Sequence, residues 1–304
     1  MNIKRILKGI LPEPLKSSYC IGFLNCSELN LPTVERYGRI KWVENPKGSW
    51  YADPFIYKNA DCFMDVFVEE MNTSKHPAGG VITKLRIDKN SYKVLDKKIL
   101  LSLPTHLSFP IFINENGKTY VYPENYQSGS VIIYEYNEQR ELLTNPRTII
   151  DEPLLDTQIV KIGNEYYAFG VKYVTGLQED TKILYIYKSH SLTGHYDLFQ
   201  TITNTRCEER GAGIIFKDAN GRIIRPAQCC EGGYGKAVIF YELDFVDGVF
   251  TETEIGRLEP NPKAKNGQVL HTFNQWGECC VIDGLRVYYP HLGKIYKKIR
   301  QIPE

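Results

Sequence analysis

The sequence lacks several features that identify common classes of protein. Its 37 basic and 36 acidic side chains give a net charge of +1, with no sustained basic stripe. Surfaces that bind nucleic acid neutralise phosphates, so this charge balance argues against such a surface. No apolar run is long enough to span a bilayer, and no long stretch carries apolar residues at helical spacing. These absences favour a β-rich globular protein that does not bind nucleic acid.

Motifs for metal binding and export are missing too. None of the eight cysteines has CxxC spacing, and the six histidines form no HExxH motif, so we expect no metal site and no cofactor. Cys229-Cys230 and Cys279-Cys280 are adjacent in sequence, and neighbours in a strand face opposite ways. The N-terminus begins like a secretion signal, but Lys8 interrupts its apolar run and no small-residue cleavage site follows. We therefore expect reduced cysteines and a cytoplasmic location.

Both ends of the chain are basic. Residues 1–18, which we expect to form a short extension, and residues 294–300 mix apolar residues with Lys and Arg. Such ends can contact an anionic membrane surface, here the inner face of the membrane. The simpler alternative is that they are solvated and pack a few apolar residues on the domain.

Tyrosine (21) and phenylalanine (13) are abundant, and many of them belong to a unit that occurs five times. Each unit opens with a polar residue and a short apolar strand, turns, and returns as a strand that ends in another polar residue. The polar residues at the openings are Asp53, Ser108, Asp156, Arg210 and His271. The turns between the strands are Asn59-Ala60-Asp61, Asn116-Gly117, Gly163-Asn164, Asn220-Gly221 and Asp283-Gly284. These are the residue types that tight hairpins need.

Four units continue into a third strand with alternating apolar residues, around Leu85, Ile133, Tyr185 and Phe240. Their spacing of about 50 residues is typical of propeller blades. The fifth unit has no third strand, whereas residues 19–24 form a spare strand near the N-terminus. We therefore predict an all-β fold, a five-bladed β-propeller whose ring is closed by the N-terminal strand, which removes free sheet edges. Because the repeat runs nearly from end to end, we expect residues 1–304 to form a single domain.

This fold also predicts where the chemistry lies. The first strand of each blade lines the central channel and the second runs back beside it, so the start of one and the end of the other reach the same mouth. The rule gathers Asp53 with Glu69 or Glu70, Ser108 with Glu124, Asp156 with Lys172, Arg210 with Gln228, and His271 with Pro290 and His291. Alternation along a strand lets only one of Glu69 and Glu70 face the channel, and we assign Glu70 to the site. Charged residues are rarely buried unless paired, so the set predicts a functional site; the alternative is an ion-pair network between blades.

Several segments carry a family resemblance. They are Trp50-Tyr51-Ala52-Asp53-Pro54-Phe55, Ser108-Phe109-Pro110, Tyr122-Pro123-Glu124, Arg225-Pro226-Ala227-Gln228, Tyr234-Gly235 and His271-Thr272-Phe273-Asn274. Over most of its length the chain resembles the propeller domain at the N-terminus of plant glucosamine inositolphosphorylceramide transferases and its bacterial relatives. More distantly it is similar to the five-bladed glycosidases of glycoside hydrolase family 43.

The glycosidase resemblance implies three carboxylates at the openings of blades one to three, acting as general base, pKa modulator and general acid. Asp53 matches the first position. Ser108 stands at the second, where a carboxylate is expected, and Asp156 stands at the third, where that family uses Glu. We expect Glu124 to supply the missing carboxylate, at a distance from Asp53 that leaves room for water.

Three hypotheses follow, and two of them are enzymes. The first is glycosyl transfer from a phosphorylated donor during the assembly of a surface glycan or glycolipid, with Asp53 as the base. In this scheme Arg210, Arg225 and Lys172 hold the phosphate, because guanidinium groups bind such oxygens in bidentate fashion. Sugar faces would stack on the aromatic residues at the mouth, which are Trp50, Tyr51, Tyr126 and Tyr234.

The second hypothesis is a glycoside hydrolase with Asp53 as base and Glu124 or Asp156 as acid. The third is a glycan-binding module without turnover, in which the same polar groups, among them Gln228, His271 and Asn274, orient a sugar. A shared fold does not transfer activity, so the sequence leaves the three open.

Overall fold

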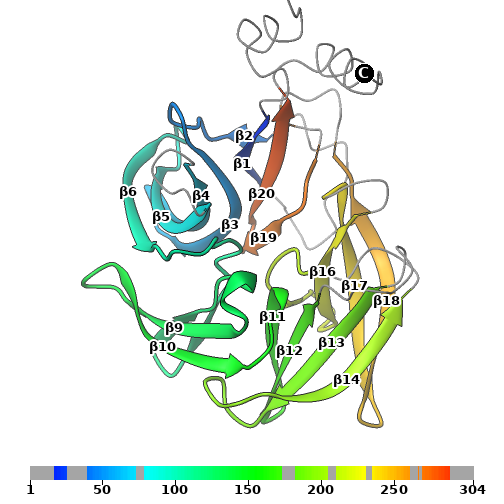
Figure 1. Cartoon of the computed structure of the whole chain (residues 1–304). Helices are drawn as coiled ribbons and strands as arrows, with labels where there is room; N and C mark the ends of the chain where they lie inside the picture. The colour runs from blue at the N-terminus through cyan, green and yellow to red at the C-terminus, as the bar shows by residue number, and fades with distance from the viewer. Residues whose placement is uncertain are drawn as a thin grey trace, which may run out of the picture.

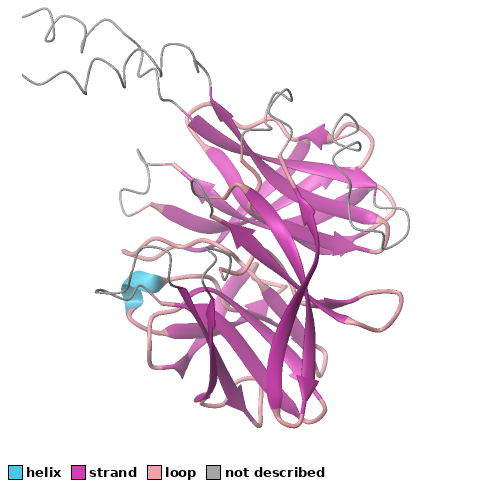
Figure 2. Ribbon diagram, turned by 90° about the vertical axis from the view of Figure 1, so that its right-hand side faces the viewer, coloured by secondary structure: helices cyan, strands magenta, loops and turns pink. Residues whose placement is uncertain are grey.

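The computed structural model describes residues 17–25, 40–72, 79–172, 182–204, 210–230, 235–260, 266 and 269–287. These residues form five four-stranded antiparallel sheets arranged around a common centre, a five-bladed β-propeller (Figure 1). Strands dominate, and a short 3₁₀ helix, η2 (Tyr126–Ser128), stands beside them (Figure 2). The predicted fold is confirmed. No helix in the described ranges is long and apolar enough to cross a membrane.

Each of the first four blades is continuous in sequence, and its first strand is innermost. Blade 1 contains β3 (Trp50–Asn59), β4 (Phe63–Met71), β5 (Gly80–Asp88) and β6 (Val94–Leu101). Blade 2 contains β7 (Phe112–Glu115), β8 (Lys118–Val121), β9 (Val131–Asn137) and β10 (Leu142–Ile150). Blade 3 contains β11 (Leu155–Ile162), β12 (Glu165–Val171), β13 (Lys182–Ser189) and β14 (Asp197–Asn204). Blade 4 contains β15 (Phe216–Lys217), β16 (Ile223–Cys229), β17 (Ala237–Val246) and β18 (Val249–Leu258).

Blade 5 joins the two ends of the described chain. Its inner strands are β19 (Phe273–Trp276) and β20 (Cys279–Val287), and its outer strands are β1 (Ser17–Asn25) and β2 (Lys41–Trp42). β1 pairs with β20 along its whole length, from Ser17 opposite Val287 to Asn25 opposite Cys279. The predicted closure is confirmed, although β2 was not expected. Residues 1–16 of the expected extension lie outside the described residues, whereas Ser17 and Ser18 belong to β1.

The turn predicted at Asp283-Gly284 is wrong. Both residues lie inside β20, and the hairpin turns earlier, around Gly277, which has a φ of 57°. A Cβ atom on Gly284 would lie 2.3 Å from the carbonyl oxygen of Asn266, so glycine allows a close approach here rather than a turn. The expectation of reduced cysteines also fails at Cys280, which is disulfide-bonded.

Aromatic side chains pack the blades against one another. Phe67 of blade 1 contacts Phe112 and Tyr136 of blade 2 edge to face, with ring centroids 5.7 and 5.2 Å apart. Phe169 of blade 3 meets Phe250 of blade 4 in the same way at 5.2 Å. Such pairs add to the free energy gained from burying their apolar area. The abundance of tyrosine and phenylalanine in the sequence is therefore explained by the packing between wedge-shaped sheets.

Candidate functional site

A cavity of about 580 Å³ lies where the inner strands begin. Its polar wall contains the carboxyl groups of Asp53, Glu69, Glu124 and Asp156 together with Ser108, His106, Gln127, Arg210 and His271. Its aromatic wall contains Tyr19, Trp50 and Tyr126. All five blades thus contribute, and Asp53, Ser108, Glu124, Asp156, Arg210, Trp50 and His271, which the hairpin rule and the resemblance gathered, line one cavity.

The backbone turns two of these carboxylates toward the channel. Asp53 and Asp156 have positive φ angles, 47° and 44°. In both strands the pairing register shifts at this point, between Ala52 and Phe55 and between Leu155 and Gln158. A bulge re-aims the side chain beside it, and a left-handed conformation in a residue other than glycine costs about 1–3 kcal/mol. Such strain is maintained only where the surrounding structure imposes it.

Blade 2 uses the same backbone conformation for a different residue. Phe109, not Ser108, has the left-handed φ, 46°, that Asp53 and Asp156 have in blades 1 and 3. The Phe109 ring is buried and packs edge to face on Phe55 at 5.1 Å. Its backbone N–H donates to Asp53 Oδ2 at 3.0 Å. Ser108 instead donates its hydroxyl to Glu124 Oε2 at 2.8 Å.

Asp53 is a buried carboxylate with an altered affinity for protons. Besides Phe109, the hydroxyl of Thr272 donates to Asp53 Oδ1 at 2.8 Å, and His271 Nδ1 lies 3.7 Å from the same oxygen. Burial raises the pKa of Asp53 to about 6, and the neighbouring charges of Asp283 and Asp156 act in the same direction, whereas His271 and Thr272 oppose them. Asp53 can therefore exchange a proton near neutral pH.

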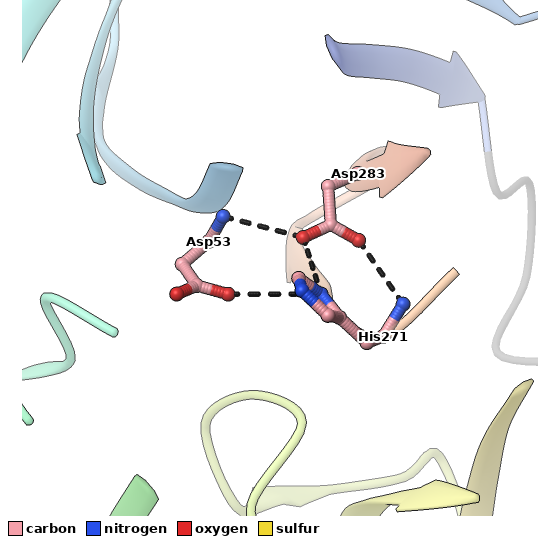
Figure 3. A group of neighbouring side chains, drawn as sticks. All are labelled: Asp53, His271 and Asp283. Carbon is pink, nitrogen blue, oxygen red and sulfur yellow. Dashed lines mark hydrogen bonds and ion pairs between the residues drawn. The ribbon is translucent and has the colours of Figure 1, made fainter. Parts of the chain in front are cut away.

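Asp283 fixes the position of both Asp53 and His271 (Figure 3). Its carboxylate accepts the backbone N–H of Asp53 at 3.3 Å and those of His271 and Thr272 at 3.1 Å each, and it lies 2.6 Å from His271 Nδ1. Although burial opposes ionisation, His271 holds the pKa of Asp283 below its usual value. In turn Asp283, followed by Asp53, raises the pKa of His271 in spite of its burial.

Asp53, His271 and Asp283 also form the one group in the described part of the chain that offers three metal-ligand atoms within 4.8 Å of one another. The short contact between His271 Nδ1 and Asp283 Oδ2 already occupies two of these atoms. We therefore interpret the group as a hydrogen-bonded chain that orients Asp53.

Glu124 and Asp156 face the cavity in different electrostatic settings. Burial, together with the charge of Asp156, raises the pKa of Glu124 to about 7, although Tyr126 N–H and the Ser108 hydroxyl donate to it at 2.7 and 2.8 Å. Asp156 instead accepts from Arg210 Nε at 2.7 Å and from Gln228 Nε2 at 2.9 Å, both at its Oδ2. Glu124 can therefore hold a proton at neutral pH, whereas Asp156 is an ion-pair partner.

Glu70 does not belong to the cavity, and this assignment is corrected in favour of Glu69. Glu70 bonds Ser49, Thr83 and Lys97 on the opposite face of β4. The bulge at Asp53 changes which residues of β3 face the channel, so alternation counted from Asp53 selects the wrong glutamate. Tyr51, which pairs with Glu70, packs in the apolar core with Ile21 and Phe23.

Arg225, Lys172, Gln228 and Asn274 do not line the cavity either. Arg225 is fully buried and forms a two-pronged ion pair with Glu252, at 2.5 and 3.1 Å. Lys172 pairs with Glu152, while Gln228 supports Asp156 from behind. Asn274 bridges blades by donating to Pro54 O and accepting from Ile214 N–H. Of these polar side chains, Gln228 and Asn274 link neighbouring blades, whereas the ion pair of Arg225 lies within blade 4. Tyr234, Pro290 and His291 lie outside the described residues.

Four functional residues escaped the sequence reasoning. Tyr19, on the closing strand β1, stacks on His271 with ring centroids 4.7 Å apart. His106 comes from a loop and Gln127 from the short helix η2, where no strand periodicity could reveal them. Asp283 was placed in a turn. The predicted closure by residues 19–24 was the one available signal, because it brings Tyr19 beside the opening of blade 5 at His271.

The fold and the cavity define the protein as a five-bladed β-propeller with a carboxylate-lined site at one mouth of its channel. Within that class the chain belongs to the family described as glucosamine inositolphosphorylceramide transferase 1, N-terminal, whose model matches residues 42–274. A glucosamine inositolphosphorylceramide transferase 1 from Oryza sativa subsp. japonica is 25% identical over 262 residues, which cover 78% of this chain and 34% of the relative. The Arabidopsis thaliana protein of that name is 26% identical over 230 residues, 72% of this chain and 29% of the relative. The chain thus spans about a third of the length of these relatives.

Solved structures confirm the fold. The catalytic domain of the Coprinopsis cinerea GH62 α-L-arabinofuranosidase superimposes with a TM-score of 0.58 at 11% identity, covering 88% of this chain and 86% of that one. An exo-β-1,3-galactanase from Phanerochaete chrysosporium, crystallised with galactose, gives a TM-score of 0.51 at 11% identity, with 71% and 55% covered. At this level of identity the likeness concerns the architecture alone.

Proposed function

We propose that the protein is a carbohydrate-active enzyme that breaks a glycosidic bond and transfers the sugar to a hydroxyl group or to water. The observation that supports this most is that one cavity holds Asp53, with its pKa raised to about 6, beside two further carboxyl groups with raised pKa values, Glu124 at about 7 and Glu69. Glycosidic bond cleavage needs one carboxylate that accepts a proton and one carboxylic acid that donates one. Both protonation states are available here near neutral pH.

Asp53 is the base in this proposal. Its oxygens are held by Phe109 N–H and the Thr272 hydroxyl, so the carboxylate has a fixed orientation. It takes the proton of the attacking hydroxyl group or water. A protonated carboxyl group on the same cavity wall gives its proton to the departing oxygen, and the candidates are Glu69 and Glu124.

The substrate class follows from charge. A phosphorylated donor, expected from the sequence, would need free cations, yet Arg210, Arg225 and Lys172 pair with Asp156, Glu252 and Glu152. Four carboxyl groups on the wall disfavour a phosphate and favour a sugar that is neutral or carries an ammonium group. The name of the relatives includes glucosamine, an amino sugar. Tyr19 and Trp50, with ring centroids 5.4 Å apart, offer apolar faces on which such a sugar can stack.

The location in the cell is a separate proposal. A cytoplasmic protein at the inner face of a membrane remains our prediction, with contact through the basic ends, which lie outside the described residues. The disulfide at Cys280 argues in the other direction, because disulfides are rare in the cytosol. Cell fractionation combined with alkylation of free thiols before lysis decides between the two.

A glycan-binding domain without turnover is the second candidate. Two observations favour it: the second carboxylate position of the related glycosidases is taken by the buried Phe109, and the chain matches only a third of its curated relatives. In this case the cavity would orient a sugar for chemistry that occurs elsewhere.

Replacement of Asp53 distinguishes the two candidates. Asp53→Asn keeps size and most hydrogen bonding but removes proton acceptance, so turnover of a panel of aryl and alkyl glycosides should fall at least about a hundredfold. Binding of the same sugars, measured by calorimetry, should change little. The exposed Asp197 provides a matched control, Asp197→Asn, which should leave both unchanged. Wild-type protein that binds sugars, and an Asp53→Asn variant that binds them equally, with no turnover by either, would leave the glycan-binding domain.

A further inference from the structure

Glu69 differs from the other three carboxyl groups of the cavity. Asp53, Glu124 and Asp156 each accept two hydrogen bonds from side-chain or backbone groups. Within the described residues the Glu69 carboxyl group makes no hydrogen bond. Its polar neighbour there is the ring of His106, whose Nε2 lies 3.6 Å from Oε1. Its side chain is only 8% exposed, and that exposure is toward the cavity that it lines. Glu69 is therefore the carboxyl group that remains available to a ligand.

A hydrogen bond from the backbone determines which ring nitrogen of His106 carries the proton. Gly80 N–H donates to His106 Nδ1 at 2.8 Å, so Nδ1 carries a lone pair and the proton of the neutral ring is on Nε2, the atom beside Glu69. Burial lowers the pKa of His106, which keeps the ring neutral. The backbone N–H of His106 donates to Gln127 Oε1 at 3.0 Å and fixes the ring from the other side.

Two glycines make room for this arrangement. A Cβ atom on Gly79 would lie 2.3 Å from His106 Nδ1, and one on Gly80 would lie 2.4 Å from Leu107 O and 2.8 Å from Glu69 Oε1. Any larger residue at either position would push the ring or the carboxyl group out of place. The pair is thus built into the backbone that begins β5.

Burial and the neighbouring carboxylates favour the protonated form of Glu69. Burial raises the pKa of Glu69 well above its usual value, and the carboxylates of Asp53 on β3, Glu124 beyond β8, Asp283 on β20 and Asp156 on β11 add to the effect. His106 is the basic group that faces it. The raised pKa favours the form of Glu69 that has a proton to give.

We propose that Glu69 is the proton donor of the reaction and that His106 positions it; this assignment rests on the proposed function. The Glu69 proton moves to the glycosidic oxygen as the carbon–oxygen bond breaks and its electron pair stays on that oxygen. Asp53 meanwhile accepts the proton of the attacking hydroxyl group or water, whose oxygen forms the new bond to the anomeric carbon of the sugar. The His106 Nε2–H then donates to the new Glu69 carboxylate, and exchange with solvent returns both carboxyl groups to their starting states.

Glu124 is less suited to this step. Both of its oxygens already accept a hydrogen bond, from the Ser108 hydroxyl and Tyr126 N–H. Those bonds hold the strand opening of blade 2 against the end of its return strand, where Ser108 and Glu124 pair through the backbone. Glu124 thus supports the wall and the substrate, whereas Glu69 is free to transfer a proton.

The test compares Glu69→Gln with Glu124→Gln on glycosides that differ only in their leaving group. A general acid is needed for an alkyl leaving group and hardly at all for nitrophenolate, which leaves unprotonated. Glu69→Gln should therefore lose at least about a hundredfold in kcat on the alkyl glycoside and less than about tenfold on the nitrophenyl glycoside. It should also lose the alkaline limb of the pH profile of kcat/KM. Glu124→Gln should affect both substrates by the same factor.

His106→Gln tests the positioning role. Its kcat should fall on the alkyl glycoside with KM unchanged, and the alkaline limb should move to a different pH, which a purely structural role would not produce. Thermal unfolding reports whether each variant is folded. If Asp53→Asn loses activity while Glu69→Gln keeps the wild-type leaving-group dependence, the proposed function stands and the assignment of Glu69 is wrong. If the wild type turns over no glycoside, the proposed function itself fails, and the proton donor with it.

Discussion

The cavity should be a source of instability, and Glu124→Gln should reveal it. Burial raises the pKa of Glu124 from 4.5 to about 7. Below pH about 4.5 the group is protonated in the folded and unfolded states alike and costs nothing. Above pH about 4.5 the carboxyl group of the unfolded state ionises, whereas that of the folded state keeps its proton. The free energy of unfolding therefore falls as the pH rises, until the folded state also ionises near pH 7. The difference amounts to about 3 kcal/mol at pH 8, from 1.36 kcal/mol for each pKa unit.

Glutamine removes this cost without breaking the local contacts. Its amide oxygen can accept from Tyr126 N–H and its NH₂ group can donate to the Ser108 hydroxyl, in place of the two bonds that Glu124 makes. Urea unfolding of wild type and Glu124→Gln at pH 4.5, 6 and 8 should give equal stability at the lowest pH. The variant should become more stable by about 2–3 kcal/mol at the highest pH.

The control is Glu278→Gln at an exposed position, which should change the free energy of unfolding by less than about 0.5 kcal/mol at every pH. A Glu124→Gln variant that is no more stable than wild type at pH 8, or a stability gain that does not vary with pH, would refute the electrostatic description of the cavity.

Two further variants test the framework behind the carboxylates. Asp283→Asn leaves His271 without its partner at 2.6 Å and should cost about 3–5 kcal/mol. The lowered pKa of Asp283 stabilises the fold above pH about 3.9, and the raised pKa of His271 stabilises it below pH about 6.5. Urea unfolding should therefore show the largest loss in the free energy of unfolding between these two pH values and a smaller loss on either side. Gly211→Ala would place a Cβ atom 2.3 Å from Asp156 O; we expect a loss of about 1–3 kcal/mol and, in the variant that still folds, weaker sugar binding. Unchanged stability of Gly211→Ala would mean that Asp156 is not held as the structure has it.

The architecture could be predicted because its signals are local and repeated. Apolar alternation and turn residues such as Asn116-Gly117 and Gly163-Asn164 act over a few residues, and five copies of one pattern reinforce one another. The closure by β1 followed from counting strands. The failure at Asp283-Gly284 has the same origin, because an Asp-Gly pair is typical of turns even where a close contact with Asn266 requires the glycine.

The site was harder to predict, because its geometry depends on a strand bulge and on ion pairs that strand periodicity does not show. The bulge at Asp53 changes the face of β3 that meets the channel, which is why Glu69 and not Glu70 lines the cavity. Arg225 has the same strand position as a site residue, yet it forms an ion pair with Glu252 on β18, two strands away in the same blade. Which charged side chains form ion pairs depends on the folded structure. The sequence could therefore identify these residues as candidates for the site but could not show which of them line it.

The closing strand β1 links the synthesis of the chain to the completion of the cavity. Tyr19 stacks on His271 and borders the cavity, and the strand that carries it, β1, pairs along its whole length with β20, which ends at Val287. Because β1 lies far ahead of β20 in the chain, β1 is synthesised long before its pairing partner. A chain that lacks either strand therefore has an incomplete cavity, and a proteolytic cut that released β1 would remove Tyr19 from the cavity wall without touching a carboxylate.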